Sequence, residues 1–291
     1  MSTPGSKGGR ASLPPVGSIL SGRYRLERLI ASGGMGAVFE AVDLEGEGSV
    51  ALKILHPVLT SDRDVRRRFR RESSVLIALS HPNIVRVLGI GAEEDEVLFS
   101  VMELLHGKTL AEHLGGRAQP ARELRGLVQG IADGLMAAHA HGVIHGDLKP
   151  ANVFLCDAQE GAAAVRLLDF GLSKVLGLER LTRTGELIGT PSYMAPELLT
   201  GRGEPDERID LYAFGVMLYE ALSGRRAYAD KVPGKLMMDI VMGRAVPLRD
   251  LVPGLSEPIA AVVARAMSPD REARYASAAE LAHAFANALE P

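Results

Sequence analysis

The sequence predicts an α+β protein with two lobes, a small antiparallel β lobe that carries one helix and a larger α-helical lobe. Three observations lead to this prediction. Short β-rich runs separated by glycines fill residues 24–55, the apolar period becomes helical at residue 62, and helical patterns predominate after residue 107. We expect a cleft between the two lobes.

Five runs in the first lobe predict strands. Turns that contain glycine, at residues 32–36 and 45–48, connect the first three runs and indicate antiparallel pairing. The predicted strands are residues 24–30, 37–42, 50–55, 84–90 and 97–102, and residues 104–107 follow as a connector.

Between the third and fourth strands, residues 62–80 predict one amphipathic helix. Its apolar face is made by Val65, Phe69, Leu76 and Leu79. Glu72 lies on the same face, so its carboxylate points toward the protein interior. A buried charge without a partner is costly, and the preceding strand offers Lys53 as the cation.

The second lobe is predicted to be mainly helical. Residues 209–222 are apolar nearly all round, as expected of a helix buried within a larger lobe. A second helix has a core-facing stripe made by Leu124, Leu127, Val128, Ile131, Leu135 and Ala138.

Composition bounds the class of protein. The chain has 291 residues, 46% of them hydrophobic, and a net charge of −3, so charge gives no reason to expect nucleic acid or an anionic membrane as partner. The single cysteine, Cys156, excludes an intramolecular disulfide and fits a reducing compartment. No stretch reaches the ~18 apolar residues of a membrane-spanning helix, so we expect a cytoplasmic protein.

The start of the chain favours a flexible tail, because residues 1–17 are rich in Gly, Ser and Pro with few large apolar groups. We expect the tail at residues 1–18 and one domain at residues 19–290, with lobes 19–103 and 104–290. Whether the chain is full length or a fragment of a larger protein stays open.

Residues 145–152, His-Gly-Asp-Leu-Lys-Pro-Ala-Asn, bring together groups that can serve phosphoryl transfer. Asp147 can accept a proton from a hydroxyl, Lys149 can neutralise phosphate charge, and Asn152 can help to hold a metal ion. After a strand-like run at residues 165–168, Asp169-Phe170-Gly171 supplies a second aspartate where a Mg²⁺ ligand is needed.

The glycine-rich turn at residues 32–36 can bring backbone N–H groups close to phosphate oxygens. Alone, such a turn is more often a plain hairpin. Its order before Lys53 and Glu72 makes the sequence resemble the eukaryotic-like (Hanks-type) serine/threonine protein kinases, in their bacterial branch, from about residue 24 to residue 289. The resemblance implies the bilobal protein kinase fold and ATP- and Mg²⁺-dependent (or Mn²⁺-dependent) phosphorylation of Ser/Thr in protein substrates, in signalling.

The roles of individual residues follow from the resemblance to the protein kinase template. Asp147 would be the catalytic base and Lys149 would neutralise the transferring group, while Lys53 would contact the α- and β-phosphates and pair with Glu72. Asn152 and Asp169 would hold the metal ion. The remaining ATP contacts would come from Ile30, Ala31, Ser32, Gly33, Gly34, Met35, Gly36, Val38, Ala51, Met102 (the gatekeeper position), Glu103, Leu105 and Phe154. For the apolar members of this set, an ordinary core role is the alternative.

Two rival functions remain. Small-molecule kinases of the aminoglycoside and choline type also carry His-Gly-Asp, but they are not expected to have Ala195-Pro196-Glu197 or the run that begins at Asp210. A pseudokinase scaffold would not need both metal ligands and the base. The resemblance also implies a buried bridge between Arg274 and Glu197, and bonds from Thr190 to Asp147 and Lys149.

Two positions depart from the family pattern. Ala31 replaces the first glycine of the phosphate loop. Gly146 replaces the arginine that usually precedes the catalytic aspartate and binds a phosphorylated activation loop. Without this arginine, Ser173, Thr182 and Thr184 lose their most obvious phosphate partner. We therefore expect activity to depend only weakly on phosphorylation of that loop.

Overall fold

The structure is a computed structural model of the chain. It describes residues 13–34, 36–46, 48–60, 63–93, 97–157, 164–170, 191–201 and 203–290, and it leaves out the side chains of residues 64, 65, 68 and 70–74. The described residues form two compact units, each of which is considered by itself. The first comprises residues 13–77 and 87–104, and the second comprises residues 78–86 and 105–290.

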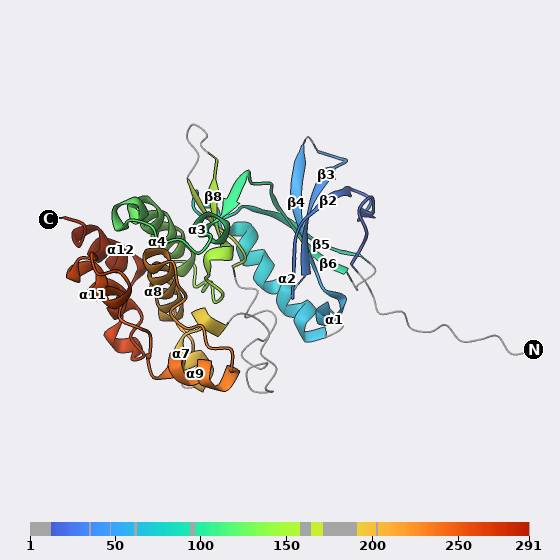
Figure 1. Ribbon diagram of the computed structural model, residues 1–291. Coiled ribbons are helices and arrows are strands. Elements are labelled where there is room, and N and C mark those ends of the chain that lie inside the picture. The colour runs from blue at the N-terminus through green and yellow to red at the C-terminus, as the bar shows by residue number, and fades with distance from the viewer. Residues whose placement is uncertain are drawn as a thin grey trace, which may run out of the picture. The chain divides into compact units, whose positions relative to one another are not determined.

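The first unit is built on a six-stranded antiparallel sheet with the strand order β1-β2-β3-β4-β6-β5 (Figure 1). Its strands are β1 (Ile19–Leu20), β2 (Tyr24–Gly33), β3 (Gly36–Asp43), β4 (Ser49–Leu55), β5 (Val87–Glu93) and β6 (Val97–Glu103). Two helices complete the unit, a single turn α1 (Pro57–Thr60) and the longer α2 (Arg63–Ala78). The predicted β lobe with one long helix is confirmed.

Buried and partly exposed residues alternate along the strands, and the buried residues form the core of this unit. In β3, Ala37, Phe39 and Ala41 are buried while the residues between them are partly exposed, as the period of two in a strand requires. Residues 13–18, which the sequence assigns to the tail, also contact this sheet. Leu13 packs on the core, and the Gly17 N–H donates a hydrogen bond to the Leu26 carbonyl at 2.8 Å.

One predicted strand begins later than expected. Residues 84–86 do not join β5, which starts at Val87, and Ile84 forms only an isolated bridge to Leu167. The Val85 N–H donates to the Leu167 carbonyl at 2.9 Å, and the Leu167 N–H donates to the Asn83 carbonyl at 2.8 Å. These backbone groups are therefore satisfied within the second unit, so the apolar run is divided between two structures.

The second unit combines a three-stranded antiparallel sheet, β7 (Gly107–Thr109), β8 (Val153–Cys156) and β9 (Val165–Leu167), with a larger set of helices (Figure 1). The described helices are α3 (Leu110–Leu114), α4 (Arg125–His139), α7 (Pro196–Thr200), α8 (Arg208–Ser223), α9 (Pro233–Val241), α10 (Leu248–Leu251), α11 (Glu257–Ala266) and α12 (Ala278–Asn287). Short 3₁₀ turns are η1 (Ala121–Leu124), η2 (Pro150–Asn152), η3 (Pro191–Tyr193) and η4 (Arg271–Ala273).

Helices α4 and α8 form the centre of this unit. Helix α8 packs against α11, and α4 packs against α12. The predicted stripe of α4 is confirmed, since Val128, Ile131 and Leu135 are buried. Helix α8 is buried on almost every side, which explains why its sequence has no polar face.

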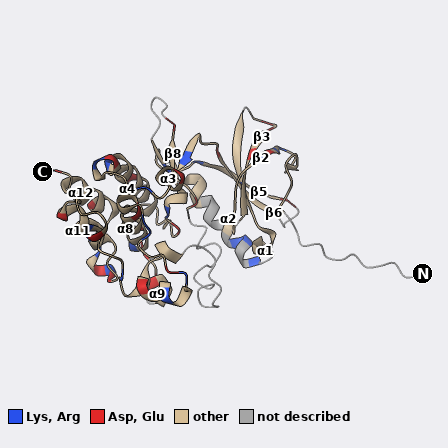
Figure 2. Cartoon of the chain, viewed as in Figure 1, with Lys and Arg blue, Asp and Glu red and all other residues tan. Residues whose placement is uncertain are grey.

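Charged residues of both signs lie on α9 and around α11 and α12 (Figure 2). Among the residues that the structure describes, no helix is long and apolar enough to span a membrane.

Candidate active site

The residues singled out in the segment 145–152 lie together in the second unit. The Lys149 Nζ donates to Asp147 Oδ2 at 2.6 Å. The Asn152 Nδ2 donates to the Asp147 carbonyl at 2.8 Å and to its Oδ2 at 3.1 Å. The turn η2 makes these contacts possible, because it brings Asn152 back toward Asp147. The carboxylate of Asp147 is thus fixed by two side chains from its own loop.

The backbone just before Asp147 is held by a buried carboxylate. Asp210, in the first turn of α8, is 1% exposed, and its oxygens accept hydrogen bonds from the N–H groups of His145 and Gly146, each at 2.8 Å. Gly146 has a φ of 73°, in the left-handed region that favours glycine. The loop can take this shape without the strain that a Cβ would bring.

His145, the first residue of this segment, is buried, and burial favours the neutral form of its ring. Complete burial lowers its pKa, and the negative charges of Asp210, Asp147 and Asp169 oppose this shift. Its Nδ1 accepts a hydrogen bond from the Asp147 N–H at 3.3 Å, and the centre of its ring lies 4.5 Å from the centre of the Phe170 ring. His145 therefore supports both the loop and the segment that contains Asp169.

Asp169 follows β9 in a left-handed conformation with a φ of 61°. Aspartate tolerates this conformation better than most residues with a side chain. The preceding residue, Leu168, donates its N–H to the Asn152 carbonyl at 2.9 Å, which places the two predicted metal-binding residues on neighbouring segments. The hydrogen bonds of Asn152 to Asp147 use its amide nitrogen, and its amide oxygen is the atom that suits Mg²⁺.

In the first unit, the glycine-rich hairpin joins β2 to β3, and Gly33 pairs with Gly36. A Cβ on Gly36 would lie 2.0 Å from the Ile54 carbonyl oxygen, so only glycine fits where β3 approaches β4. Register then places Val38 opposite both Ala31 and Lys53.

The other residues that are predicted to bind ATP are divided between the two units. In the first, Ala51 pairs with Met102 in β6, which ends at Glu103. In the second, Phe154 pairs with Thr109 and Arg166, and Leu105 precedes β7. Glu72 lies within α2, but its side chain is outside the described residues. Met35, Gly171, Ser173, Thr182, Thr184 and Thr190 are also outside them.

A small cavity beside Asp147 was not foreseen from the sequence. Its volume is about 30 Å³, which is room for about two water molecules. Its walls include Gly146, Asp147, Tyr193, Met194, Leu198 and Ile209. The segment 193–198 therefore lies next to the loop that carries Asp147.

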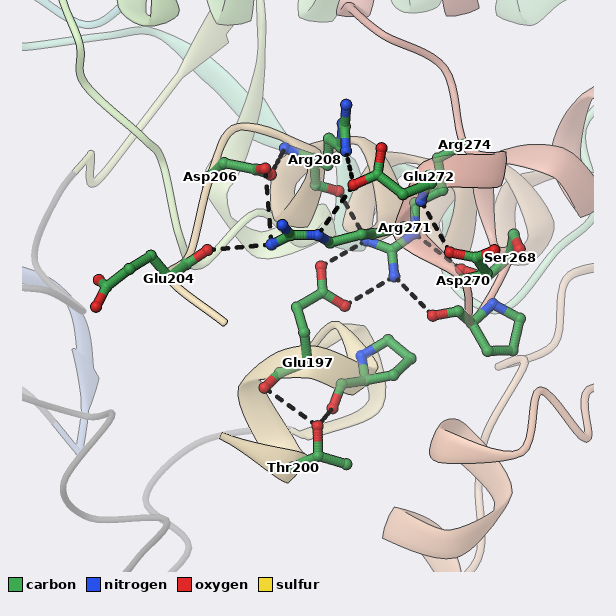
Figure 3. A network of polar contacts seen from close by, with 12 residues as sticks. Glu197, Thr200, Glu204, Asp206, Arg208, Ser268, Asp270, Arg271, Glu272 and Arg274 are labelled. Atoms are coloured by element: carbon green, nitrogen blue, oxygen red, sulfur yellow. Dashed lines mark hydrogen bonds and ion pairs between the residues drawn. The ribbon is translucent and has the colours of Figure 1, made fainter. Parts of the chain in front are cut away.

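The predicted bridge between Arg274 and Glu197 is confirmed (Figure 3). The guanidinium donates to both carboxylate oxygens, at 2.7 and 2.8 Å, and the side chain of Arg274 has no exposed surface. It also donates to the carbonyls of Ser268 and Arg208 and lies over the ring of Tyr212. Helix α7 is thereby fixed to α8 and to the segment after α11.

A second layer of charge surrounds this bridge (Figure 3). Arg271 donates to the Glu204 carbonyl at 3.2 Å and lies 3.8 Å from Asp206, while Arg208 pairs with Glu272 at 2.5 Å. These side chains are partly exposed, so water and salt weaken their contribution to stability. Sequence reasoning missed this layer because its pairs join loops that are distant in the chain.

Comparison with known proteins identifies the fold. A sequence profile described as the protein kinase domain matches residues 24–286. The chain belongs to the protein kinase family. Within it, the kinase domain is of the Hanks serine/threonine type, and its relatives are bacterial. It is 36% identical over 281 residues to serine/threonine-protein kinase pkn2 of Myxococcus xanthus, covering 95% of this chain and 34% of that protein.

A second relative is PknJ of Mycobacterium tuberculosis, 39% identical over 278 residues, which cover 94% of this chain and 46% of PknJ. The chain thus spans about a third to a half of the length of these two relatives. Among solved structures, the crystal structure of the PknI kinase domain of M. tuberculosis matches with a TM-score of 0.77 and 28% identity, over 95% of this chain and 99% of that one. The kinase fold, with its β-sheet lobe and helical lobe, is confirmed.

Proposed function

We propose that this kinase domain, at residues 19–290, transfers the γ-phosphoryl group of ATP to Ser or Thr hydroxyls of protein substrates in a signalling role. The observation that carries the proposal is the fixed carboxylate of Asp147, bonded by Lys149 and Asn152 and set on a backbone that Asp210 holds. A scaffold without catalysis would not need a base together with two residues suited to hold a metal ion.

Asp147 is suited to orient the attacking hydroxyl and accept its proton. The hydroxyl oxygen forms a bond to the γ-phosphorus as the bond from that phosphorus to the bridging oxygen of ATP breaks. Lys149, 2.6 Å from Asp147 Oδ2, supplies positive charge beside the reacting group.

The amide oxygen of Asn152 and the carboxylate of Asp169 are oxygen donors of the kind that suits a divalent cation. Asn152 and Asp169 are the residues that would hold it, and a bound Mg²⁺ or Mn²⁺ would neutralise phosphate charge. For ATP itself we propose the residues of the glycine-rich hairpin, Lys53 with Glu72, and the apolar set that includes Ala51, Met102 and Phe154.

Protein is the preferred acceptor over a small molecule. Glu197 and Arg274 fix α7, and the segment just before α7 lines the cavity beside Asp147. The segment before α7 is thus held next to the proposed base, where we expect the peptide around the acceptor hydroxyl to bind. Lys149, two residues after Asp147, also matches the pattern specific to Ser/Thr kinases.

The acceptor is tested by incubating the domain with γ-labelled ATP, Mg²⁺ and either a basic protein such as histone or a mixture of choline and an aminoglycoside. We expect label on Ser and Thr of the protein. Label on the small molecules alone would establish metabolite phosphorylation, and no transfer to either or to the domain itself would favour a scaffold.

A further inference from the structure

A histidine side chain contacts the glycine-rich hairpin at residues 32–36 in the first unit. The Nε2 of His56 lies 3.1 Å from the carbonyl oxygen of Gly33, which is 23 positions earlier in the chain. A carbonyl only accepts hydrogen bonds, so Nε2 carries the hydrogen and donates it to Gly33. His56 directly follows β4, the strand that carries Lys53. The bond therefore ties the hairpin to the end of β4.

His56 makes this contact from a fixed backbone. Its carbonyl accepts hydrogen bonds from the N–H groups of Leu59 and Thr60 in α1, at 2.9 and 3.3 Å. The preceding residue, Leu55, is buried and pairs with Gly36 at the other side of the hairpin. The histidine is thus anchored to the sheet and to α1, next to the hairpin that it contacts.

Burial does little to fix the arm of the hairpin that β2 supplies. Every residue of β2 from Glu27 to Gly33 is exposed, and the pairing of β2 with β3 shifts register twice between Leu26 and Ala31. Glycine also loses more conformational freedom than other residues when it becomes ordered. A hydrogen bond from an anchored side chain therefore matters more for order here than it would in a buried, regular strand.

The Gly33 carbonyl also sets the direction of a neighbouring donor. It belongs to the same planar peptide unit as the N–H of Gly34, and the two groups point in opposite directions across that unit. Holding the carbonyl against His56 therefore fixes where the Gly34 N–H points. Backbone N–H groups of such turns are donors for phosphate oxygens, and donors that are oriented before binding lower the entropic cost of binding.

We propose that His56 is a positioning residue for the phosphates of ATP, because it holds the Gly33 carbonyl and so orients the Gly34 N–H before the nucleotide binds. The inference rests on the proposed binding of ATP by the hairpin. His56 belongs neither to the residues proposed to bind ATP nor to those proposed for catalysis, so its effect passes through the hairpin.

Two substitutions separate hydrogen bonding from packing. His56→Leu keeps a similar volume and removes the donor, whereas His56→Gln retains an amide N–H at a similar reach. The matched control is His283→Leu, because His283 is exposed on α12, a helix that carries none of the residues proposed to bind ATP. If His56→Leu does not fold, His56→Asn, whose shorter amide cannot reach Gly33, takes its place.

Binding of ADP and of adenosine, measured by titration calorimetry with Mg²⁺ present, supplies a readout that does not depend on activity. We expect His56→Leu to raise the Kd for ADP about threefold to tenfold, as the loss of one hydrogen bond implies. The Kd for adenosine, which has no phosphate, should not change. His56→Gln should recover most of the affinity for ADP, and His283→Leu should bind both ligands as the wild type does.

Kinetics provide a second comparison. In transfer of phosphate from ATP to a protein, His56→Leu should raise the KM for ATP by the same factor as the Kd for ADP and leave kcat unchanged, because the bond is present before and during the reaction.

An unchanged Kd for ADP in His56→Leu would overturn the inference, and so would equal losses of affinity for ADP and adenosine. Equal losses in the Leu and Gln variants, or a fall in kcat with the KM for ATP unchanged, would overturn it as well. Failure of the proposed transfer looks different, because the wild type would then leave protein substrates unlabelled, while the Kd values for ADP and adenosine would still decide the inference.

Discussion

At residue 146 the backbone has a φ of 73°, and a residue with a Cβ pays about 1–2 kcal/mol to adopt such a conformation. Glycine avoids this cost, and its N–H still reaches Asp210. The same glycine carries no cation, whereas the family pattern has an arginine at this position to bind a phosphorylated loop. Glycine therefore makes the loop before Asp147 easier to form, and we predict that it also weakens the dependence on phosphorylation.

We predict that Gly146→Ala lowers the free energy of unfolding by about 1 kcal/mol, measured by urea denaturation. The control is Gly126→Ala in α4, where nothing lies within 4 Å of the added Cβ and φ is not positive. Because alanine favours a helix, the control should lose no stability. Equal effects at the two positions would show that residue 146 is not strained by a side chain.

Residue-scale reasoning from the sequence found Asp147, Lys149 and Asn152 because they are close in the chain and a short turn brings them together. It did not find His139. The Nε2 of His139 lies 2.8 Å from Oδ2 of Asp210, which is 71 residues later in the chain. A histidine at the end of an amphipathic helix is an ordinary pattern. Only the three-dimensional structure shows which carboxylate its ring meets.

At the scale of elements, α7 depends on tertiary contacts, above all on a buried ion pair, rather than on the intrinsic stability of the helix. A helix of five residues has little intrinsic stability in water. The bidentate contact of Glu197 with Arg274, together with the carbonyls around the guanidinium, fixes it in place. The local sequence indicated this bridge only through resemblance to the family.

We predict that Arg274→Leu lowers the free energy of unfolding by about 3–5 kcal/mol, because it leaves the Glu197 carboxylate without its partner. The matched control is Arg271→Leu in the partly exposed layer, which should cost less than about 1 kcal/mol. Urea denaturation of both variants provides the comparison. A loss of similar size in the two would mean that the buried pair has no special role.

The fourth predicted strand illustrates where patterns along the chain fail. Residues 84–90 form one apolar run, but the backbone of Val85 bonds to Leu167 while Val87 begins β5. Apolar periodicity indicates that residues are buried and does not say against which element. The sequence therefore predicted correctly that a strand is present, but the predicted start was wrong by three residues.

For the whole molecule, the order of motifs along the chain was the strongest sequence signal, and it predicted a kinase fold with a sheet lobe and a helical lobe. Within the second unit, the packing of segments also depends on contacts between residues that are distant in the sequence, such as the ion pairs of the charged layer around Arg274 (Figure 3). Such pairs leave no local pattern, so sequence reasoning could not foresee them.

Regulation is a property of the whole domain. With Gly146 in place of the usual arginine, we predict that Thr182→Ala combined with Thr184→Ala changes the initial rate on an exogenous protein by less than about tenfold. Ser173→Ala provides a comparison within the same loop. A loss of about a hundredfold or more would show that phosphorylation of those threonines controls activity by a route other than residue 146.

The central claim is that Asp147 is the base of a protein kinase, and transfer of labelled γ-phosphate from ATP to a protein tests it most directly. The comparison is between wild type, Asp147→Asn and the control Asp157→Asn, since Asp157 is an exposed residue that follows β8. We predict that Asp147→Asn lowers the rate by at least about a hundredfold and that the control transfers phosphate as the wild type does. Equal incorporation by wild type and Asp147→Asn would contradict the account.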